Sequence, residues 1–236
     1  MHIEVISTVN EAREGRLAQR TAIVIDVLRA TSTIVTALEA GACGVVPVET
    51  VLEARALGRS GDLLAGERFC RKIAGFELGN SPYEFTPEVV RNRRVVLTTT
   101  NGTRALHKSL RADHVLAGCL MNATACAKAA AELRRDVVLL CAGSHDEFAL
   151  EDGLCAGLII SKIKSFCGQN VETDDFGTAM HGFYQHAQHN VVGTLLSGTT
   201  GKRLIKLGCS RDVERCAQID CSQAVPRLQG DTLQLS

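Results

Sequence analysis

The chain has 236 residues and a mass of 25.3 kDa, the size of one or two ordinary globular domains. Lys and Arg total 26 and Asp and Glu total 26, so the formal net charge is zero. Polyanion binders need a basic face, and proteins that bind acidic membranes need a basic cluster. The composition therefore argues against nucleic-acid and membrane partners, and any anionic ligand has to be bound by local charges.

The ten cysteines are the unusual feature of the composition. None of them forms a C-x-x-C pair, and several lie in apolar runs, such as Cys141 at the end of Val137–Cys141. Reduced cysteines behave as small buried hydrophobic side chains in proteins of the reducing cytoplasm. The first residues lack the basic and apolar regions of a signal peptide, and no apolar run approaches about 18 residues. These features predict a cytoplasmic protein with free thiols.

Short β-branched runs alternate with helical patterns through the first 150 residues. Strands are expected at Ile3–Ser7, Thr21–Asp26, Gly44–Val48, Asp62–Ala65, Arg94–Thr98, His114–Ala117 and Asp136–Ala142. Helices are expected between them at Thr33–Ala40, Val51–Arg59, Thr103–Leu110 and Asn122–Leu133. Nearly continuous apolar runs such as residues 21–25 are typical of strands covered on both faces. The alternation predicts an α/β fold, with a mainly parallel sheet and helices on both of its faces.

From Leu150 onward the patterning becomes more helical. Further helices are expected at Leu150–Phe166, Asp174–Asn190, Lys202–Leu207 and Arg211–Ala217. The chain has only four prolines, and it contains no Pro/Gly/Ser-rich linker and no internal repeat. The sequence therefore predicts one compact domain over residues 1–236.

The loop after the strand at Thr21–Asp26 combines a carboxylate, an arginine and three hydroxyls in Asp26-Val-Leu-Arg-Ala-Thr-Ser-Thr33. Free amides and the helix dipole at the start of the next helix favour an anion there. An aspartate just before them suits a divalent cation shared with that anion. The alternative is purely structural, with Thr31 or Ser32 as a helix cap and Asp26 as an ordinary loop residue.

Three further segments have a similar polar character. Leu97–Thr103 holds four threonines and an asparagine, more donors than one helix cap needs, and Cys141–Glu147 is followed by Glu151 and Asp152. Acidic residues in a helix's first turn are also ordinary dipole partners. These loops follow expected parallel strands at their carboxyl ends, where open α/β sheets bind ligands. The fourth segment, Gly66–Pro82, is a loop of about 15 residues without periodicity, and such loops are more often functional than accidental.

Two familiar phosphatase motifs are incomplete. Cys209–Arg215 has the Cys-x5-Arg spacing of cysteine phosphatases, but Asp212 and Glu214 inside it would repel a phosphate. The haloacid dehalogenase arrangement requires a second aspartate two positions after the nucleophile, and here Leu28 follows Asp26 at that spacing. An aspartyl-phosphate route is therefore disfavoured, although it is not excluded.

Together these segments make the sequence similar to the 2-phosphosulfolactate phosphatase family (the ComB-type enzymes). The resemblance rests on Asp26-Val-Leu-Arg-Ala-Thr-Ser-Thr33, Gly66-Glu67-Arg68, Gly75-Phe-Glu-Leu-Gly-Asn-Ser-Pro82, Thr99-Thr-Asn-Gly-Thr103 and Glu151-Asp152-x3-Ala156-Gly157. It also includes the C-terminal Asp212, Cys216 and Val225-Pro226, so it extends over nearly the whole chain. Cys70 departs from the family pattern, which usually has a glycine there.

The resemblance implies a magnesium-dependent phosphatase that hydrolyses 2-phospho-3-sulfolactate to 3-sulfolactate and phosphate, a step of coenzyme M biosynthesis in methanogens. The family also occurs in bacteria without that pathway, so the reaction class is better defined than the substrate. Such a substrate is dense in negative charge, and a neutral protein has to bind it with Mg²⁺ and local cations such as Arg29, Arg68, Lys72 or Arg104. Catalysis is expected to depend on in-line positioning and charge neutralisation, with the metal activating water.

The resemblance also implies a role for each candidate site residue. Asp26, Glu67 and Asp152 are expected to bind the metal and its waters. The phosphate is assigned to Arg29 and the amides of Ala30–Thr33, which include Thr31, Ser32 and Thr33. The catalytic set is Asp26, Arg29, Thr100 and Asn101, and the other substrate contacts are Arg68, Asn80, Ser81, Thr99, Gly102 and Thr103. Asp26 could act as nucleophile, general base or metal ligand, and these roles stay open at this point.

Two other functions and one question of assembly also stay open. The chain could be a phosphatase of another small phosphorylated hydroxy acid, or a non-catalytic protein that binds phosphorylated acids. The carboxylates argue against the second, because phosphate binding alone would not require them. A homo-oligomer is possible, since the apolar helix Gly153–Ile163 could pack in the core or against another subunit.

Overall fold

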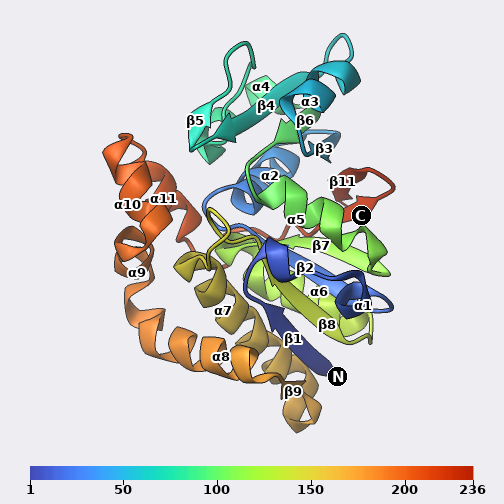
Figure 1. The fold of residues 1–236 in the computed structure, drawn as a ribbon, viewed down its shortest axis with the longest axis vertical. Helices are drawn as coiled ribbons and strands as arrows, with labels where there is room; N and C mark the ends of the chain where they lie inside the picture. Colours follow the sequence, from blue (N-terminus) through green and yellow to red (C-terminus); the bar gives the residue numbers. More distant parts are fainter. Residues whose placement is uncertain (236) are drawn as a thin grey trace.

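A computed structural model describes residues 1–235 of the chain. Within them, eleven strands form one sheet in the order β5-β4-β6-β3-β11-β10-β7-β2-β8-β1-β9. The upper part of Figure 1 holds β3, β4 and β6, and the lower part holds β1, β2, β7 and β8. The strands are β1 (His2–Ile6), β2 (Thr21–Ile25), β3 (Gly44–Val48), β4 (Leu63–Arg68), β5 (Arg71–Lys72), β6 (Arg94–Thr98), β7 (His114–Gly118), β8 (Val137–Cys141), β9 (Glu172–Thr173), β10 (Pro226–Gln229) and β11 (Thr232–Leu235).

Helices connect most of the strands and make up most of the C-terminal part. The α-helices are α1 (Glu14–Leu17), α2 (Ala30–Glu39), α3 (Val51–Leu57), α4 (Pro87–Val90), α5 (Gly102–Lys108), α6 (Ala123–Glu132), α7 (Leu150–Cys167), α8 (Asp175–Ala187), α9 (Val191–Ser197), α10 (Thr199–Lys206) and α11 (Ser210–Cys216). Each strand and helix expected from the sequence is present, with ends shifted by a few residues. The expected α/β class with a more helical C-terminal part is confirmed, whereas α1, α4, α9, the short strands β5 and β9 and the hairpin β10–β11 were not predicted.

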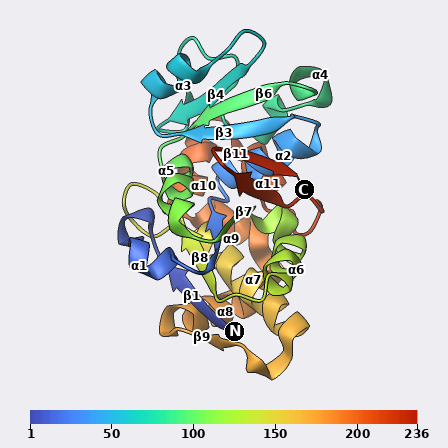
Figure 2. The same cartoon turned by 90° about the vertical axis from the view of Figure 1, so that its right-hand side faces the viewer.

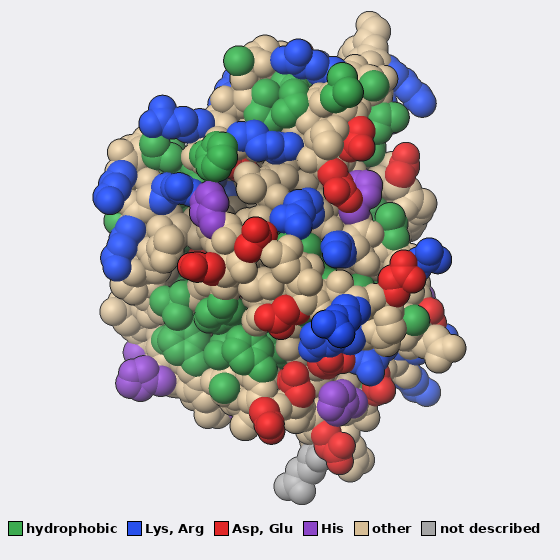
Figure 3. All heavy atoms as spheres, viewed as in Figure 1, with side chains coloured by type: hydrophobic (Ala, Val, Ile, Leu, Met, Phe, Trp, Pro, Cys, Tyr) green, Lys and Arg blue, Asp and Glu red, His purple; other side chains and the backbone are tan. Residues whose placement is uncertain are grey.

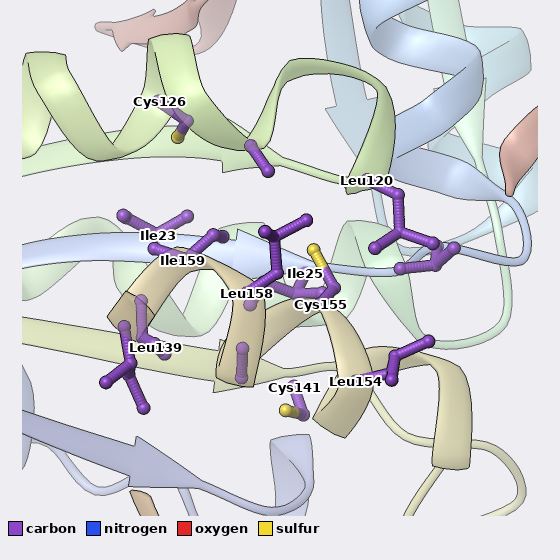
Figure 4. Close-up of a cluster of buried hydrophobic side chains, with 14 of the residues drawn as sticks. Ile23, Ile25, Leu120, Cys126, Leu139, Cys141, Leu154, Cys155, Leu158 and Ile159 are labelled. Atoms are coloured by element: carbon purple, nitrogen blue, oxygen red, sulfur yellow. The ribbon is translucent and has the colours of Figure 1, made fainter. Parts of the chain in front are cut away.

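The central strands are covered by helices on both faces. Ile23 and Ile25 of β2 belong to one buried cluster with residues of α6 and α7, whereas Ala22 and Val24 belong to another with residues of α2 and α5. Successive strand residues point to opposite faces, so both faces of β2 are buried. Figure 4 shows α7 packing on β2 and β8 through Leu154, Cys155, Leu158 and Ile159. This burial explains the nearly continuous apolar runs in the sequence.

The ten cysteines are all free in the part of the chain that the structure describes. Five of them are buried: Cys119, Cys126, Cys141, Cys155 and Cys216. Burial raises the pKa of the Cys119 thiol to about 11, which keeps it protonated and unreactive at neutral pH. The prediction of free, mostly core-packed thiols is therefore confirmed for these buried positions.

The surface bears charges of both signs. On the face shown in Figure 3, Lys and Arg side chains are intermingled with Asp and Glu, and apolar side chains gather toward the lower left. This mixture agrees with the zero net charge of the sequence. Among the described residues, no helix combines the length and apolar character that crossing a membrane requires.

The C-terminal hairpin joins two groups of parallel strands. β10 and β11 are antiparallel to each other, β10 is antiparallel to β7, and β11 is antiparallel to β3. In Figure 2 the hairpin is seen in the middle of the molecule, between β3 above and β7 below. It follows that the strands of one group, β4-β6-β3, run in the opposite direction to those of the other group, β7-β2-β8-β1. The sequence predicted a mainly parallel sheet and did not predict this reversal.

The loops at the carboxyl ends of the two groups nevertheless line one pocket. Neighbouring strands are rotated by about 20–25° on average, and six neighbouring pairs separate β4 from β2. A rotation accumulated over six pairs offsets much of the opposite direction of β4 and β2. A single pocket is lined by Asp26 after β2, Glu67 at the end of β4, Thr100 after β6 and Gly143 after β8. Two groups of strands that run in opposite directions therefore contribute polar loops to the same pocket.

Candidate active site

The pocket at the carboxyl ends of the strands collects seven of the residues expected at the site. They are Asp26, Arg29, Glu67, Asn80, Thr100, Asn101 and Asp152. The pocket is also lined by Glu151, His145, Phe69 and Arg203, which were not among the candidates. The remaining candidates, Thr31, Ser32, Thr33, Arg68, Ser81, Thr99, Gly102 and Thr103, lie outside its lining.

Asp26 is fixed by the first turn of α2. Its Oδ1 accepts a hydrogen bond from the Ala30 amide at 3.1 Å. The Thr31 hydroxyl accepts from the Asp26 amide at 3.0 Å and donates to the Asp26 carbonyl at 2.9 Å. The carboxylate accepts from the first amide of α2 and at the same time lines the pocket, so hydrogen bonds within Asp26–Thr31 set its position.

Three of the four amides expected to cradle the phosphate, those of Ala30, Thr31 and Thr33, have acceptors within the protein. The Ala30 amide bonds to the Asp26 carboxylate, the Thr31 amide donates to the Asp26 carbonyl at 3.0 Å, and the Thr33 amide donates to the Arg29 carbonyl at 2.9 Å. The Ser32 and Thr33 hydroxyls donate to the carbonyls of Val27 and Asn80. In this structure the hydroxyls of Thr31, Ser32 and Thr33 therefore shape the loop.

Glu67 is held by the two loops beside it. Its Oε1 accepts from the Thr100 amide at 2.8 Å and from the Thr100 hydroxyl at 2.9 Å. Its Oε2 accepts from the Cys70 amide at 2.6 Å. The Thr100 side chain, expected to contact substrate, therefore orients the Glu67 carboxylate.

Asp152 connects the loops that follow β2 and β8. Its Oδ1 accepts from the Val27 amide at 2.9 Å, and its Oδ2 accepts from the Gly143 amide at 3.1 Å. The Asn101 side-chain amide donates to the Gly143 carbonyl at 3.0 Å. These bonds fix a carboxylate from α7 beside Asp26 and hold Asn101 at the edge of the same loop.

The pocket concentrates carboxyl groups in buried surroundings. Burial raises the pKa of Asp26 to about 7, and the charges of Glu67 and Glu151 act in the same direction against the amide of Ala30. Burial, with the charges of Asp26 and Glu151, also places the pKa of Asp152 well above its ordinary value. Burial raises the pKa of Glu151, whose Oε2 has no hydrogen-bond partner among residues 1–235. Carboxyl groups gathered in this way favour a bound cation.

Arg29 enters the pocket from the other side of the same loop. Its Nη1 lies 2.5 Å from Asp212 Oδ2, and its Nη2 donates to the Cys70 carbonyl at 3.0 Å. Burial disfavours the charged guanidinium, but the hydrogen bond and charge of Asp212 outweigh it and raise the pKa of Arg29. The Ser81 hydroxyl donates to Asp212 Oδ1 at 2.7 Å. Asp212, which the sequence suggested would repel a phosphate, instead holds the cation that can bind one.

The other candidates outside the pocket have structural partners. The Thr99 amide donates to the Thr103 hydroxyl and the Thr103 amide donates to the Thr99 hydroxyl, both at 3.2 Å, at the start of α5. The Arg68 guanidinium donates to the Thr98 hydroxyl at 2.9 Å and to the Glu49 carbonyl at 3.0 Å. These side chains shape the loops around the pocket, and the structure does not place Arg68 where it would contact a ligand there.

Gly102 is required by the close approach of α5 to Asp26. A Cβ atom at position 102 would lie 2.5 Å from both Asp26 Oδ2 and the Ala30 Cβ. Replacing Gly102 with alanine is expected to lower the free energy of unfolding by about 1–3 kcal/mol, because the backbone has to shift. Denaturant unfolding measures the change. The matched control is Gly182→Ala in α8, where a Cβ meets nothing within 4 Å and alanine is the better helix former; a Gly102→Ala variant as stable as this control would contradict the packing.

The donor atoms around the pocket suit a hard divalent cation. Carboxylate oxygens come from Asp26, Glu67, Glu151 and Asp152, and the Asn80 side-chain oxygen is buried without a partner among the described residues. Within residues 1–235, no three His, Cys, Asp or Glu side chains form a ready-made metal cage. Mg²⁺ rarely uses such cages, because it keeps several waters and binds through one or two carboxylates and a substrate phosphate. The residues therefore fit Mg²⁺.

Comparisons with known proteins identify the family of the chain. A family model described as 2-phosphosulpholactate phosphatase matches residues 6–231. A protein of Caldanaerobacter subterraneus subsp. tengcongensis is 39% identical over 240 residues, which cover 100% of this chain and 99% of the relative. A protein of Thermotoga maritima is 40% identical over 212 residues and 89% of each chain, and one of Clostridium acetobutylicum is 38% identical over 231 residues, covering 96% of this chain and 97% of the relative.

Each of these three relatives is named "Probable 2-phosphosulfolactate phosphatase". The matched residues 6–231 contain the loops that supply Asp26, Glu67, Thr100 and Asp152, and also the helix that supplies Asp212. The resemblance inferred from the loop motifs is thus confirmed over almost the whole chain, and the chain belongs to the 2-phosphosulpholactate phosphatase family.

Proposed function

We propose that the chain is a Mg²⁺-dependent phosphatase that hydrolyses 2-phospho-3-sulfolactate to 3-sulfolactate and phosphate. Its family makes it a phosphoric monoester hydrolase. The observation that supports this reaction most directly is the pocket itself, where buried carboxylates lie beside the arginine that Asp212 holds in place. Carboxylates for a cation and a cation for a phosphate are the two requirements of metal-assisted phosphate-ester hydrolysis.

Asp26, Glu67 and Asp152 are the residues that would hold Mg²⁺, directly or through its waters. Each carboxylate is oriented by backbone amides, those of Ala30, Cys70 and Val27 among them. Bound Mg²⁺ neutralises phosphoryl charge and lowers the pKa of coordinated water. The hydrogen bonds from these amides hold the carboxylates in place, so little reorganisation is needed when the cation binds.

Arg29 would bind the phosphoryl oxygens. A guanidinium has five N–H donors, and Asp212 and the Cys70 carbonyl account for two hydrogen bonds from Nη1 and Nη2. The remaining donors and the positive charge suit a phosphoryl group whose charge grows in the transition state. Asp26 supports the cation, attacks the phosphorus itself, or accepts a proton from the attacking water, for which a pKa of about 7 is well placed.

The direct test is release of phosphate from 2-phospho-3-sulfolactate and from other phosphorylated hydroxy acids, with Mg²⁺ and with EDTA. We expect release from the first substrate with Mg²⁺ and its loss with EDTA. Release from other phosphorylated acids alone would keep the chemistry and change the substrate. Binding of these compounds without release under any condition would favour a non-catalytic binding protein.

Mg²⁺ is also expected to stabilise the fold. A ligand that binds only the folded protein raises its stability, by about 2.7 kcal/mol when present at a hundred times its Kd. The melting temperature should therefore rise with Mg²⁺ and fall back with EDTA, and Asp152→Asn should reduce the rise. The control is Asp175→Asn, which changes an exposed carboxylate in α8. An identical Mg²⁺ response in the wild type and Asp152→Asn would exclude Asp152 from the metal site.

A role in coenzyme M biosynthesis, a cytoplasmic location and a homo-oligomeric assembly stay predictions. The first depends on which substrate is turned over, and the phosphate-release panel addresses it. The second rests on the free thiols. The third is decided by the mass of the protein in solution.

A further inference from the structure

A second group of side chains borders the pocket without belonging to the carboxylate cluster. It consists of Arg203 from α10, His145 from the loop between β8 and α7, and Phe69 from the turn between β4 and β5. The Phe69 and His145 rings are stacked, with centroids 6.0 Å apart and planes at 15°. The Arg203 Nη1 contacts the His145 Nε2. Three segments distant in sequence therefore hold one edge of the pocket.

Arg203 differs from Arg29 in its partners. Arg29 is paired with Asp212, whereas Arg203 makes no ion pair with Asp or Glu within residues 1–235. Its side chain contacts His145, whose ring carries no negative charge. A half-buried guanidinium that lines a pocket and lacks an acidic partner is suited to a ligand oxyanion, which it can bind through two parallel N–H donors.

We propose that Arg203, supported by His145, binds one of the two acidic groups that the substrate carries besides the phosphate, its sulfonate or its carboxylate. The inference rests on the proposed function, because it assigns the two arginines of the pocket to two anions of one molecule. Arg29 lies in the Asp26 loop, beside the carboxylates that would hold the cation. Arg29 and this cation are therefore assigned to the phosphate. Arg203 then selects phosphorylated acids that carry a sulfonate or a carboxylate on an adjacent carbon, and it discriminates against simple alkyl phosphates.

The first experiment measures binding without turnover. 3-Sulfolactate and lactate are each titrated into the wild type, Arg203→Ala and Lys202→Ala by calorimetry, Lys202 being the exposed neighbour on α10 outside the pocket lining. We expect Arg203→Ala to weaken 3-sulfolactate binding about 10- to 100-fold, the effect of losing a charge-assisted hydrogen bond. Lys202→Ala should bind as the wild type does. A wild type that prefers 3-sulfolactate to lactate, with the preference lost in Arg203→Ala, identifies the group as the sulfonate; equal weakening of both ligands identifies the carboxylate.

The second experiment separates selection from catalysis. The kcat/KM of Arg203→Ala is expected to fall for 2-phospho-3-sulfolactate and 2-phospholactate, mainly through KM, and to change by no more than about threefold for isopropyl phosphate. Arg203→Lys should recover part of the loss, since it restores charge without the planar pair of donors, and it also serves if Arg203→Ala does not fold.

Two results would overturn the proposal: equal losses of kcat/KM on all three substrates, or 3-sulfolactate binding that is undetectable in the wild type or unchanged in Arg203→Ala. The binding arm does not require hydrolysis. A protein that binds 3-sulfolactate through Arg203 but releases no phosphate would therefore disprove the proposed function while supporting this inference.

Discussion

The Asp26→Asn variant is expected to release phosphate from 2-phospho-3-sulfolactate at no more than about a thousandth of the wild-type rate, the scale of loss when a central charged group is removed from an active site. Asparagine has the size of aspartate, and its side-chain oxygen can still accept from the Ala30 amide. The variant therefore removes the negative charge while leaving the first turn of α2 in place. Phosphate release at saturating Mg²⁺ measures the effect, with Asp175→Asn as the matched control.

The same variant should be more stable than the wild type when the metal is removed. Burial raises the pKa of Asp26 to about 7, above the value of 3.8 expected in the unfolded chain. Between these two values the folded protein holds a proton that the unfolded chain has released, so the wild type loses stability as the pH rises. Asparagine does not titrate. In EDTA, the advantage of Asp26→Asn in unfolding free energy should therefore grow from about pH 4 to about pH 7 and then level off.

Near-normal turnover in Asp26→Asn, with an unchanged response to Mg²⁺, would remove Asp26 from both the catalytic and the metal-binding assignments. Normal turnover with a weaker Mg²⁺ response would leave it as a metal ligand only. A stability difference independent of pH would contradict the raised pKa. Loss of activity together with higher stability in EDTA is the expected pair of results, since active-site carboxylates are commonly placed at a cost to stability.

Removing Asp212 is expected to destabilise the fold by about 3–5 kcal/mol, the cost of leaving one charge of a buried ion pair without its partner. The side chains of Arg29 and Asp212 are only 5% and 6% exposed. Asp212→Ala leaves the Arg29 guanidinium and the Ser81 hydroxyl without their acceptor. Denaturant unfolding measures the loss, and Glu14→Ala is the control, because Glu14 forms an ion pair with Arg111 that is 67–76% exposed. A loss below about 1 kcal/mol for Asp212→Ala would show that the Arg29–Asp212 pair contributes no more to stability than an ordinary surface ion pair.

A double variant separates the structural role of this ion pair from its part in catalysis. Arg29→Met combined with Asp212→Leu replaces both charges by apolar side chains, which often restores the stability that a single substitution removes. If Arg29 binds the phosphate, the double variant should regain stability and remain inactive. Recovery of phosphate release along with stability would show that Arg29 acts only in folding.

The sequence by itself determined the elements of the fold, because their signals are local. The apolar run of β2 is buried on both faces, and Gly41 follows α2 with φ of +96°, a conformation that ends helices and suits glycine. The same local logic placed Asp26 and Thr100 after the strands that precede them, and both residues line the pocket. The spacing of apolar residues and the composition of a loop can be interpreted without knowing which distant residues the segment contacts.

The tertiary structure decided which neighbours these residues meet. Whether the Thr31 hydroxyl faces a ligand or the Asp26 backbone depends on hydrogen bonds within the folded loop. Asp212 reaches Arg29, 183 positions earlier in the chain, because α11 packs beside the Asp26 loop. Arg203 lies on an ordinary amphipathic helix, and nothing in its local sequence distinguishes it from Lys202. Contacts between such distant residues depend on how the helices and strands pack together. No local sequence pattern predicts that packing.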